Sequence, residues 1–563
     1  MRWTIKPKPD PSKVARLSKE LAVDSTTSFL LAQRGIETFE EAKNFFRPDL
    51  SDLHDPFLMK DMEKAVSRIE EAVENQENIL VYGDYDVDGT TSVALMSSYL
   101  LSFYPNVATY IPDRYEEGYG ISYKGIDFAE DNNFSLIIAL DCGIKAIDKV
   151  AYAFKKEVDF IICDHHRPGA EIPKAKAVLD PKQEDCDYPF KELCGCGVGF
   201  KLIQALASKK GATIDDLVLY LDLVATAIGA DIVPIVGENR ILAYHGLKVI
   251  NENPRPGFEA ILKQVKKEKL TITDVVFIIA PRINAAGRMK HGNHAVTLLC
   301  ETDNNLAAEY AIDIDTYNTD RRDADKRITI EALVQIEENK EQDRFTSVVF
   351  DENWHKGVIG IVASRLIETY YRPTLVFTKS GEMLAASARS VKGFDVYNAL
   401  EKCTEYIEQF GGHKYAAGLT LKPENYKSFK AQFEKVVEET IDPKMLIPEI
   451  SIDSQISLSD ITPKFYRILS QFAPFGPGNM TPVFMSEDIQ DTGYGKQVGE
   501  DKTHLRFTAT QHGSGKIVGI GFGLGEHIEL IKNKKPFKAA YTIDENEWNG
   551  NVSLQLKLKD IKP

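Results

Sequence analysis

Short runs of valine, isoleucine and leucine alternate with amphipathic segments through the first half of the chain. The apolar runs have the length of β-strands and cover residues 79–82, 107–112, 135–140, 159–163 and 175–180. The segments between the runs place apolar residues at helical spacing, as Ala65, Ile69 and Val73 do before the first run. Strands that are apolar along their whole length are typical of a parallel sheet covered by helices on both faces. The pattern therefore predicts a parallel α/β lobe over residues 51–293.

A second α/β unit follows a long charged segment. Between His294 and Lys356 the chain contains neither Gly nor Pro. Its sparse apolar positions predict a long, partly exposed helix over 294–344 that links two lobes. Beyond this helix, short apolar strands alternate again with helical patterns, one of them at 395–411, and the segment 421–440 closes the unit. This pattern predicts a smaller α/β lobe over 345–446.

The two ends of the chain differ from the α/β lobes in their pattern of apolar residues and turns. Residues 447–563 contain short alternating strands separated by Gly and Asn turns, which predicts a small C-terminal β-barrel of the oligonucleotide-binding (OB) type. Residues 1–50 carry prolines and short helical pieces, so we expect an N-terminal arm or cap rather than an independent domain. The predicted fold class is α/β, with a parallel-sheet lobe joined by a long helix to a second smaller α/β lobe, plus the OB-like barrel.

Composition narrows the class of protein. The net charge of −16 and the pI of about 5.3 count against a protein that coats nucleic acid over its whole surface. They do not exclude a nuclease, whose contact surface can be basic on an acidic body. The longest apolar runs are too short to span a bilayer, and the N-terminus has no apolar signal core. Seven scattered cysteines are typical of reduced thiols, so we expect a cytoplasmic protein.

Acidic and imidazole side chains follow three of the predicted strands. In "GDYDVDG", "LDCG" and "DHH" these side chains are Asp84, Asp86, Asp88, Asp141, Asp164, His165 and His166. In an open parallel sheet, ligands bind beyond the carboxyl ends of the strands, so we expect the three groups to converge. Because alternate residues of an extended chain share a face, Asp84, Asp86 and Asp88 are expected to point the same way.

Convergent carboxylates and imidazoles indicate a metal site. Four or more carboxylates cannot share a small site unpaired, because like charges repel. With Asp231 at the end of a later apolar run as a further candidate, the donor types suit Mn²⁺ or Mg²⁺, and two ions about 3.5–4 Å apart would make a two-metal phosphoesterase site. Single motifs have other readings: Asp88 before Gly-Thr-Thr is a candidate helix N-cap, and "DHH" a candidate turn with surface histidines. Three such strand ends together favour the metal site.

In this order, the three motifs resemble those of the DHH phosphoesterase superfamily. The segments "PRINAAGRM", "HKGVIGIVASRL", "SARSVKGFDV" and "GGHKYAAGLTL" resemble the RecJ family within it, whose members are single-strand-specific 5′→3′ exonucleases. The resemblance covers roughly residues 50–440, and the predicted barrel also fits. It implies a DHH catalytic domain at 51–293, a DHHA1-type substrate-binding domain at 345–446 and a nucleic-acid-binding OB-like barrel at 447–563.

The resemblance also implies two Mn²⁺ (or Mg²⁺) ions. The expected ligands are Asp84, Asp86, Asp88, Asp141, His165 and Asp231. Among them Asp141 would bridge the ions, and His166 would act beside His165 as a ligand or a phosphate contact. Asp222 is a rival to Asp231 as the last ligand.

One position departs from the superfamily pattern. Many members have a His four residues before the first ligand Asp, and here that residue is Tyr82. Asp84 would take its place, either by binding an ion directly or by holding the other two acids of the motif in position.

A second implied set binds substrate. Its members are Arg114, Arg282, Asn284, Arg288, Lys356, Ser387, Arg389, Gly411, Gly412 and His413. Glycine lets the backbone approach a phosphate closely, and arginine offers a bidentate fork. "PRINAAGRM" is expected to form a phosphate-contacting turn facing the cleft between the lobes. The alternatives are a tight turn for "GGHKYAAG" and ion pairs between these cations and the abundant carboxylates.

These inferences combine into one hypothesis: a metal-dependent exonuclease that degrades single-stranded DNA 5′→3′ to mononucleotides, in DNA recombination and repair. The second lobe would anchor a 5′-phosphate, and a narrow cleft would exclude duplex DNA. The barrel would hold the trailing strand, with Phe472, Phe475 and Trp548 as stacking platforms, although aromatic residues in so small a barrel are more often core. The alternatives are a DHH phosphodiesterase acting on short oligonucleotides or cyclic dinucleotides, and a non-catalytic scaffold, against which the intact acidic set argues.

The family also implies partners. They are single-strand-binding protein and a RecQ-type helicase, and we expect the protein itself to be a monomer. Because the chain ends soon after the predicted barrel, we expect no added C-terminal partner-binding domain.

Overall fold

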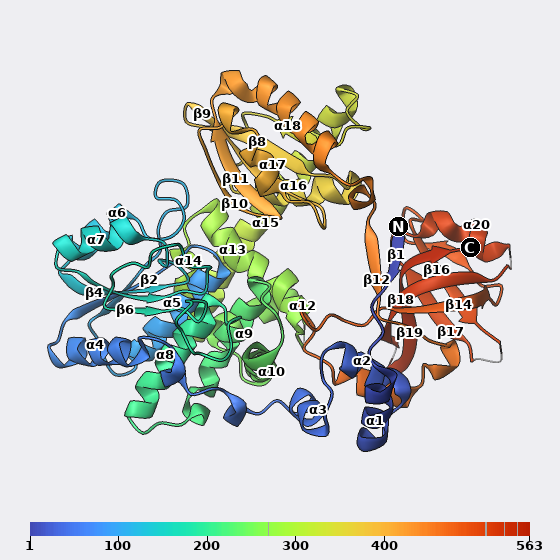
Figure 1. Cartoon of the computed structure of the whole chain (residues 1–563), viewed down its shortest axis with the longest axis horizontal. Coiled ribbons are helices and arrows are strands. Elements are labelled where there is room, and N and C mark those ends of the chain that lie inside the picture. The colour runs from blue at the N-terminus through green and yellow to red at the C-terminus, as the bar shows by residue number, and fades with distance from the viewer. Residues whose placement is uncertain (268, 513–514, 534, 549) are drawn as a thin grey trace.

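The chain folds into two α/β lobes and a β-domain. The computed structural model describes residues 1–267, 269–512, 515–533, 535–548 and 550–563, without the side chain of Trp548. The stacking platform predicted at Trp548 therefore lies outside the described side chains. Figure 1 shows the first lobe at the left, the second lobe at the top and the β-domain at the right, beside the N-terminal segment. None of the helices in the described ranges combines the length and the apolar character that a membrane crossing requires.

A five-stranded parallel sheet forms the centre of the first lobe. Its strands are β2 (Asn78–Gly83), β3 (Val107–Tyr110), β4 (Phe134–Leu140), β5 (Asp159–Cys163) and β6 (Ala177–Leu179). The order is β3-β2-β4-β5-β6, and every neighbouring pair is parallel, which confirms the prediction. The chain places β3 on one side of β2 and β4 on the other, so the connections diverge at the carboxyl ends of β2 and β4. In open parallel sheets this switch point is where ligands bind.

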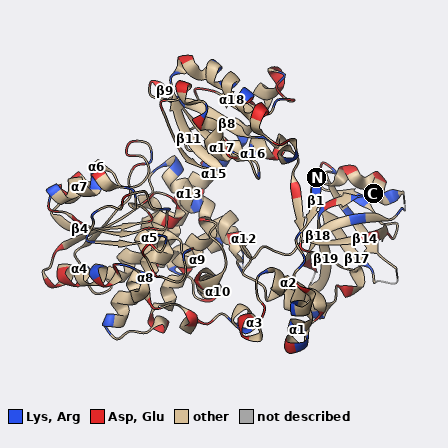
Figure 2. Ribbon diagram, in the orientation of Figure 1, with Lys and Arg blue, Asp and Glu red and all other residues tan. Residues whose placement is uncertain are grey.

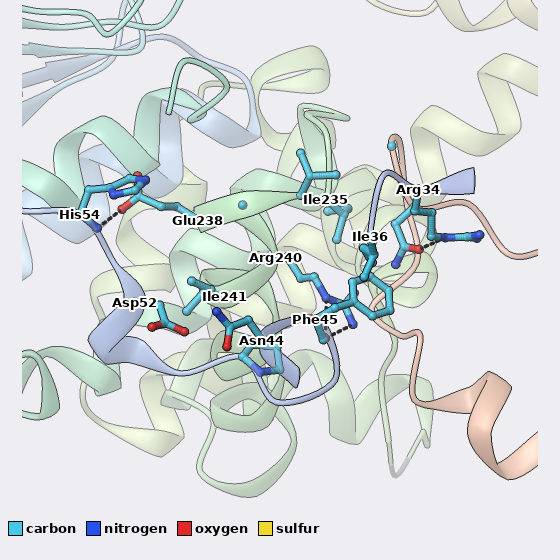
Figure 3. A pocket seen from close by; sticks show the side chains of 15 residues that line it. Arg34, Ile36, Asn44, Phe45, Asp52, His54, Ile235, Glu238, Arg240 and Ile241 are labelled. Atoms are coloured by element: carbon cyan, nitrogen blue, oxygen red, sulfur yellow. Dashed lines mark hydrogen bonds between the residues drawn. The ribbon is translucent and has the colours of Figure 1, made fainter. Parts of the chain in front are cut away.

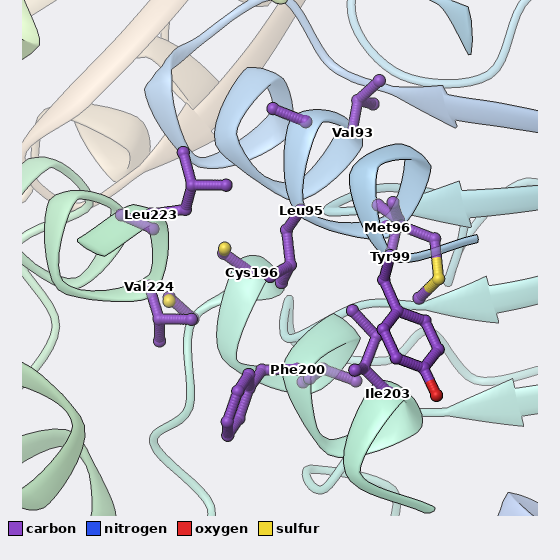
Figure 4. Close-up of a cluster of buried hydrophobic side chains, with 14 of the residues drawn as sticks. Val93, Leu95, Met96, Tyr99, Cys196, Phe200, Ile203, Leu223 and Val224 are labelled. Atoms are coloured by element: carbon purple, nitrogen blue, oxygen red, sulfur yellow. The ribbon is translucent and has the colours of Figure 1, made fainter. Parts of the chain in front are cut away.

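Helices cover both faces of this sheet. The helices of this lobe are α4 (Met62–Glu74), α5 (Val87–Leu101), α6 (Tyr123–Asp131), α7 (Ile147–Lys155), α8 (Gly195–Lys209), α9 (Leu221–Ala230), α10 (Gly237–Glu252), α11 (Pro256–Val265), α12 (Ile272–Asp274), α13 (Ala280–Met289) and α14 (Asn293–Cys300). Of these, α4 to α8 pack on the strands, and α9 to α14 pack mainly on other helices. Because side chains alternate along a strand, Ile79 and Val81 enter the core with α5, α8 and α9, whereas Leu80 and Tyr82 enter the core with α6 and α7. Figure 4 shows the first of these cores, where side chains of α5, α8 and α9 interdigitate.

A 35-residue helix, α15 (Asn304–Glu338), leads to the second lobe. It lies within the segment predicted as helical, and Asp303 caps its start. The second lobe contains β7 (Ser347–Phe350), α16 (Ile359–Thr369), β8 (Thr374–Ser380), β9 (Met383–Arg389), α17 (Val396–Glu401), β10 (Gln409–His413), β11 (Ala416–Leu421) and α18 (Tyr426–Thr440). Its strands form one mixed sheet in the order β10-β11-β9-β8-β7.

The helix predicted over residues 395–411 is wrong in its second half. The helix α17 is short, and the chain continues into β10, where Phe410 pairs opposite Leu419 of β11. Phe410 packs against the same core as Leu400 of α17. Pairing with β11 therefore overrides the local helical spacing.

The C-terminal domain is built on a seven-stranded sheet. Its strands are β13 (Ser454–Gln455), β14 (Phe484–Asp491), β15 (Lys496–Val498), β16 (His504–Thr510), β17 (Ile517–Gly521), β18 (Phe537–Trp548) and β19 (Asn551–Lys562), and its helices are α19 (Pro463–Ser470) and α20 (Ile528–Lys532). The order is β13-β14-β18-β19-β17-β16-β15, with an additional pairing of β14 with β16.

The N-terminal segment packs on this C-terminal domain. It contains β1 (Arg2–Ile5), α1 (Pro11–Leu21), α2 (Ser25–Gln33) and α3 (Phe39–Phe46). Strand β1 pairs in parallel with β12 (Glu449–Ile452), and Leu17, Leu30 and Leu31 belong to the core of the C-terminal domain. The first and last parts of the chain therefore share one hydrophobic core.

Phe472 is a core residue and not a stacking platform. Its ring is fully buried between the rings of Phe45 and Phe46, at centroid distances of 5.3 and 5.4 Å. Phe475 is half-buried against the same core. The prediction of Phe472 as a platform is wrong because the N-terminal segment, distant in sequence, covers the ring.

Candidate functional site

The first acidic motif does not stay extended, which corrects the predicted alternation. Strand β2 ends at Gly83, and α5 begins at Val87 with Asp86 as its N-cap, whose Oδ1 accepts the amide of Gly89 at 3.0 Å. Asp88 therefore lies in the first turn of α5. A Cβ on Gly89 would come within 2.3 Å of the carbonyl oxygen of Asp84, so glycine is required for the helix to start this close to the strand. The three acids reach the site from a strand end, a cap and a helical turn.

Asp88 is held by the start of α8. The amides of Gly195 and Cys196 each donate to one of its carboxylate oxygens at 2.7 Å. Burial and then the charge of Asp86 raise the pKa of Asp88 to about 7 in spite of these two amides. A Cβ on Gly195 would lie 2.6 Å from Cβ of Asp141, so the first turn of α8 is wedged between the two acids.

His165 lies at the centre of the acidic side chains. Its Nε2 is 3.2 Å from Oδ1 of Asp141, 3.6 Å from Oδ2 of Asp231 and 3.8 Å from Oδ2 of Asp88. Burial lowers the pKa of His165 to about 3, so the ring is neutral. Among the described residues, neither ring nitrogen has a hydrogen-bond partner, nor does Oδ1 of Asp141. Buried acceptors without donors are costly, and a cation at their common focus would satisfy them.

Asp84 is fully buried, and one of its carboxylate oxygens has no hydrogen-bond partner among the described residues. Its Oδ1 accepts the amide of Gly120 at 3.2 Å, and its Oδ2 has no hydrogen-bond partner in the described chain. Burial and the charge of Asp86 raise the pKa of Asp84 well above its usual range. Tyr82 does not compete for the site, because its hydroxyl donates to the carbonyl of Gly120 at 2.9 Å and accepts the amide of Ser122 at 3.1 Å.

Asp164 orients His166, a role that the sequence did not reveal. Its Oδ1 accepts Nδ1 of His166 at 2.7 Å, and its Oδ2 accepts the amide of Ile144 at 2.9 Å. Burial would raise the pKa of Asp164, but the hydrogen bond and charge of His166 outweigh it and lower the pKa to about 2. Burial likewise would lower the pKa of His166, but its bond to Asp164 raises that pKa to about 9. His166 is thus a cation at the edge of the site, with Nε2 3.2 Å from the hydroxyl of Tyr119.

Geometry separates the two rivals for the last ligand. Asp231 follows α9 with its side chain 31% exposed, and burial and the charges of Asp88 and Asp86 raise its pKa to about 8. Asp222 is fully buried inside α9, and Arg255 donates Nε and Nη2 to its two oxygens, both at 2.7 Å. Asp231 lies beside His165, whereas Asp222 is committed to an ion pair.

The assembled atoms fit a divalent metal. Two groups of candidate ligand atoms are compact enough to hold an ion, because the atoms of each group all lie within 4.8 Å of one another. One group comes from Asp141, His165 and His166, and the other from Asp88, His165 and Asp231. Carboxylate oxygens with imidazole nitrogens are the donors that Mn²⁺ accepts, and Mg²⁺ shares the carboxylate preference. The acids with raised pKa values need either protons or cations, and bound ions supply the cations.

"PRINAAGRM" forms the helix α13, so the prediction of a turn is wrong. This helix follows directly on the π-helical turn Val275–Ile279, with Pro281 as its second residue, and Ala285 and Ala286 favour the helix that continues to Met289. Arg282 donates Nη2 to Asp315 of α15 at 2.8 Å, so its charge is paired. Asn284 lies half-buried on the same helix.

Three arginines gather where α13 meets the second lobe. Arg288 donates Nη1 to the carbonyl of Gly357 at 2.8 Å, Arg389 donates Nη1 to Ser387 Oγ at 3.2 Å, and the guanidinium of Arg114 lies 4.6 Å from the ring centre of Tyr85. Burial and then the charges of Arg114 and Arg389 lower the pKa of Arg288 to about 10. Figure 2 shows the basic segments at α13. These cations contact neutral groups, so the cluster is suited to an anion.

A helix start adds to this cluster. Gly360 lies in the first turn of α16, and a Cβ there would meet Ser387 Oγ at 2.8 Å and Arg389 Nη2 at 3.0 Å. The positive end of α16 therefore lies directly beside Arg389.

The remaining predicted substrate residues are more exposed. Lys356 donates to Ser380 Oγ at 3.0 Å. Gly411, Gly412 and His413 lie exposed on β10, which runs from the second lobe toward α13 and α15 in Figure 1.

A cavity of about 360 Å³ lies elsewhere, between the N-terminal segment, the start of α10 and the loop before β14. Arg240 lines it and donates to the carbonyl oxygens of Phe45 and Phe472, and thereby ties three parts of the chain together (Figure 3). No residue of the acidic cluster or of the arginine cluster lines this cavity.

Three family descriptions match the chain. They are the DHH family, N-terminal domain, over residues 78–228, the DHHA1 domain over residues 342–439, and the RecJ OB domain over residues 452–560.

Two curated relatives are named single-stranded-DNA-specific exonuclease RecJ. The protein of Bacillus subtilis is 37% identical over 566 residues, which cover all of this chain and 70% of the relative. The protein of Escherichia coli is 33% identical over 559 residues, which cover 95% of each chain.

Two solved structures share the fold. The crystal structure of RecJ from Thermus thermophilus in complex with Mn²⁺ matches the whole chain and 79% of its own, with a TM-score of 0.86 and 26% identity. The complex of the same protein with Mg²⁺ matches with a TM-score of 0.78 and 24% identity over the whole chain and 78% of its own.

Proposed function

The chain belongs to the RecJ family of single-stranded-DNA-specific exonucleases, and we propose from this premise that it degrades single-stranded DNA from the 5′ end to mononucleotides with divalent metal ions. The observation that carries the proposal is the set of buried, unsatisfied oxygen and nitrogen atoms around the neutral ring of His165. A protein that did not bind cations there would have no physical reason to bury these groups together.

The residues that would hold two ions are Asp88, Asp141, His165 and Asp231, whose ligand atoms lie together, and Asp86, whose charge raises the pKa values of these acids. Oδ2 of Asp84 has no hydrogen-bond partner in the described chain and is a further candidate ligand. Bound Mn²⁺ or Mg²⁺ would supply Lewis-acid activation of water and of the scissile phosphate. Asp164 fixes the orientation of His166, and the imidazolium can donate a hydrogen bond from Nε2 to a phosphate oxygen at the edge of the site.

The arginine cluster supports 5′ polarity. Arg288, Arg389 and Arg114 lie together with the N-terminal end of α16, a combination that suits a terminal phosphate with nearly two negative charges. A strand anchored there by its 5′-phosphate would present a fixed phosphodiester to the acidic cluster. Cleavage would then release one nucleotide at a time.

The C-terminal domain would hold the trailing strand. Tyr494 and Phe522 are 71% and 59% exposed there and replace the buried Phe472 as stacking candidates. A grip on a long strand counts against an enzyme specialised for dinucleotides.

We further place the activity in the cytoplasm, in recombination and repair, with single-strand-binding protein and a RecQ-type helicase as partners of a monomeric enzyme. The seven cysteines are all unpaired, as that compartment requires.

The test uses single-stranded DNA labelled at either end, with Mn²⁺, beside duplex DNA and a dinucleotide. We expect labelled mononucleotide to appear first from the 5′ label, with little hydrolysis of the duplex. Release that starts at the 3′ end would overturn the polarity. Equal rates on the duplex would overturn the single-strand preference.

A further inference from the structure

The buried side of the helix α15 changes from apolar to polar residues where the helix passes between the two lobes. Toward the two ends of the helix this side is apolar, with Ala311 and Ile314 before the change and Ile328 and Ala332 after it. Between them the same face carries three polar residues, Asn318, Arg321 and Asp325. Their spacing of three and four residues puts them on one side of the helix. Asn318 is 4% exposed and Asp325 is 1% exposed, so this polar interruption faces the protein and not the solvent.

Asp325 has a charged partner, and Arg321 does not share it. Arg365 of α16 donates Nε to both oxygens of Asp325, at 2.9 and 2.8 Å. Arg321 donates Nη2 to the neutral amide oxygen of Asn318 at 2.6 Å. Its Nε is buried and has no hydrogen-bond partner among the described residues. The side chain of Arg321 is partly buried, and a buried N–H group without an acceptor is costly unless an anion joins it.

The surroundings of Arg321 are cationic. Burial lowers the pKa of Arg321, and the charges of Arg322, Arg365 and Arg282 lower it further against the opposing charge of Asp325. This electrostatic influence extends to the arginine cluster of Arg114, Arg288 and Arg389, because the charge of Arg321 also lowers the pKa of Arg288. Arg282 differs from Arg321 in having its own carboxylate partner, Asp315. Arg321 therefore lies near Asp325 but, unlike Arg282, forms no ion pair of its own among the described residues.

We propose that Arg321 is a further binding residue for the 5′-terminal phosphate, contributed by the connecting helix. The inference rests on the proposed function and deepens it, since it concerns how that enzyme distinguishes a 5′-phosphate from a 5′-hydroxyl end. A terminal phosphate carries nearly two charges where an internal phosphate carries one. An additional cation at the junction therefore favours the phosphorylated end over every other part of the strand. Asn318 holds the guanidinium in position from one turn before it.

The test compares Arg321→Gln, Arg321→Lys and the control Arg322→Gln on two oligonucleotides that differ only in a 5′-phosphate or a 5′-hydroxyl. Arg322 is the adjacent residue of the same helix and is exposed, so the control removes the same charge. With Mn²⁺, the ratio of kcat/KM for the phosphorylated over the hydroxyl strand should fall on the order of tenfold or more in Arg321→Gln, the value of a charge-assisted bond. Arg321→Lys should recover part of the ratio, and Arg322→Gln should match the wild type.

A purely structural role of Arg321 predicts a different outcome. It would lower the melting temperature and reduce both rates by the same factor, leaving the ratio unchanged, and that result would overturn the inference. An unchanged ratio with unchanged rates would overturn it as well. If the wild-type enzyme releases nucleotides from the 5′ end without preferring the phosphate, the phosphate anchor and this inference fall while the exonuclease assignment stands. If it releases none, the proposed function itself falls.

Discussion

Gly195 is the point at which one added methyl group should disturb two acids of the site together. Its amide donates to Asp88, and its Cα faces Asp141 so closely that a Cβ would lie 2.6 Å from Cβ of Asp141 and 2.8 Å from its Cα. Ordinary van der Waals contact begins at 3.4 Å. In Gly195→Ala the start of α8 and Asp141 must therefore separate by about 0.6–0.8 Å. Part of the contact is backbone, so rotation of a side chain cannot relieve it.

The size of the expected effect follows from this displacement. Overpacking of a well-packed site costs about 1–3 kcal/mol of stability. A shift approaching 1 Å in a catalytic constellation lowers the rate by about 100-fold. We expect Gly195→Ala to lose about two orders of magnitude in kcat, to bind Mn²⁺ more weakly and to remain folded.

Gly197→Ala is the matched control. It lies on the same helical turn, but its Cβ would meet the side chain of Leu193 at no less than 3.3 Å. Because alanine favours the helix by up to about 1 kcal/mol over glycine, this variant should be as active and as stable as the wild type or more stable. Nucleotide release from single-stranded DNA, Mn²⁺ titration and thermal unfolding provide the readouts. Full activity and full Mn²⁺ affinity in Gly195→Ala would refute the claim that the start of α8 positions the two acids.

Three further results are expected. Asp180 is fully buried after β6, and burial raises its pKa to about 7, so its ionisation costs stability that grows from about pH 4 and is complete above about pH 7. Asp180→Asn should therefore stabilise the metal-free protein by up to about 4 kcal/mol at pH 8 and leave its stability unchanged at pH 4. Equal gains at both pH values would contradict this. Asp222→Asn leaves Arg255 without its buried partner and should lower the free energy of unfolding, measured by chemical denaturation, by about 3–5 kcal/mol. Asp231→Asn should keep the stability of the wild type and lose activity. The reverse pattern would show that the two residues had been assigned the wrong roles. Mn²⁺ at 100 times its dissociation constant should stabilise the wild type by about 2.7 kcal/mol in calorimetry, and an absence of stabilisation would count against a built metal site.

Much of the architecture was predictable because it depends on patterns that are local in sequence. The continuous Val/Ile/Leu runs become β2 to β6, because strands buried on both faces tolerate few polar residues. The errors arose where distant parts of the chain decide the structure. Phe472 is buried because Phe45 and Phe46 arrive from the other end of the chain, and Phe410 joins a strand because β11 pairs with it.

In the candidate site too, features that are local in sequence were predictable and features that depend on distant parts of the chain were not. Placement of Asp141 and His165 follows from their positions at strand ends. The alternation of Asp84, Asp86 and Asp88 suggested an extended segment, with Asp88 as the candidate N-cap, but the cap of α5 is Asp86 and Asp88 lies in the first turn. Backbone amides that hold a carboxylate, such as those of α8, have no sequence signature, because any residue supplies them.

Arg321 was missed for a related reason. Its segment reads as a solvated, charged helix, and only the packing of α15 between the lobes shows that one arginine faces inward without a carboxylate of its own.

We infer that the acids around His165 form a metal centre that cleaves DNA from its 5′ end. One measurement tests it directly: nucleotide release from 5′-labelled and 3′-labelled single-stranded DNA by the wild type and by Asp141→Asn, at saturating Mn²⁺. Asp141 is chosen because it is 2% exposed and 3.2 Å from His165, so no other described acid lies nearer to that ring. We expect the wild type to release the 5′ label first, and Asp141→Asn to release neither label at a measurable rate while remaining folded. Undiminished release by Asp141→Asn, or release that begins at the 3′ label, would contradict it.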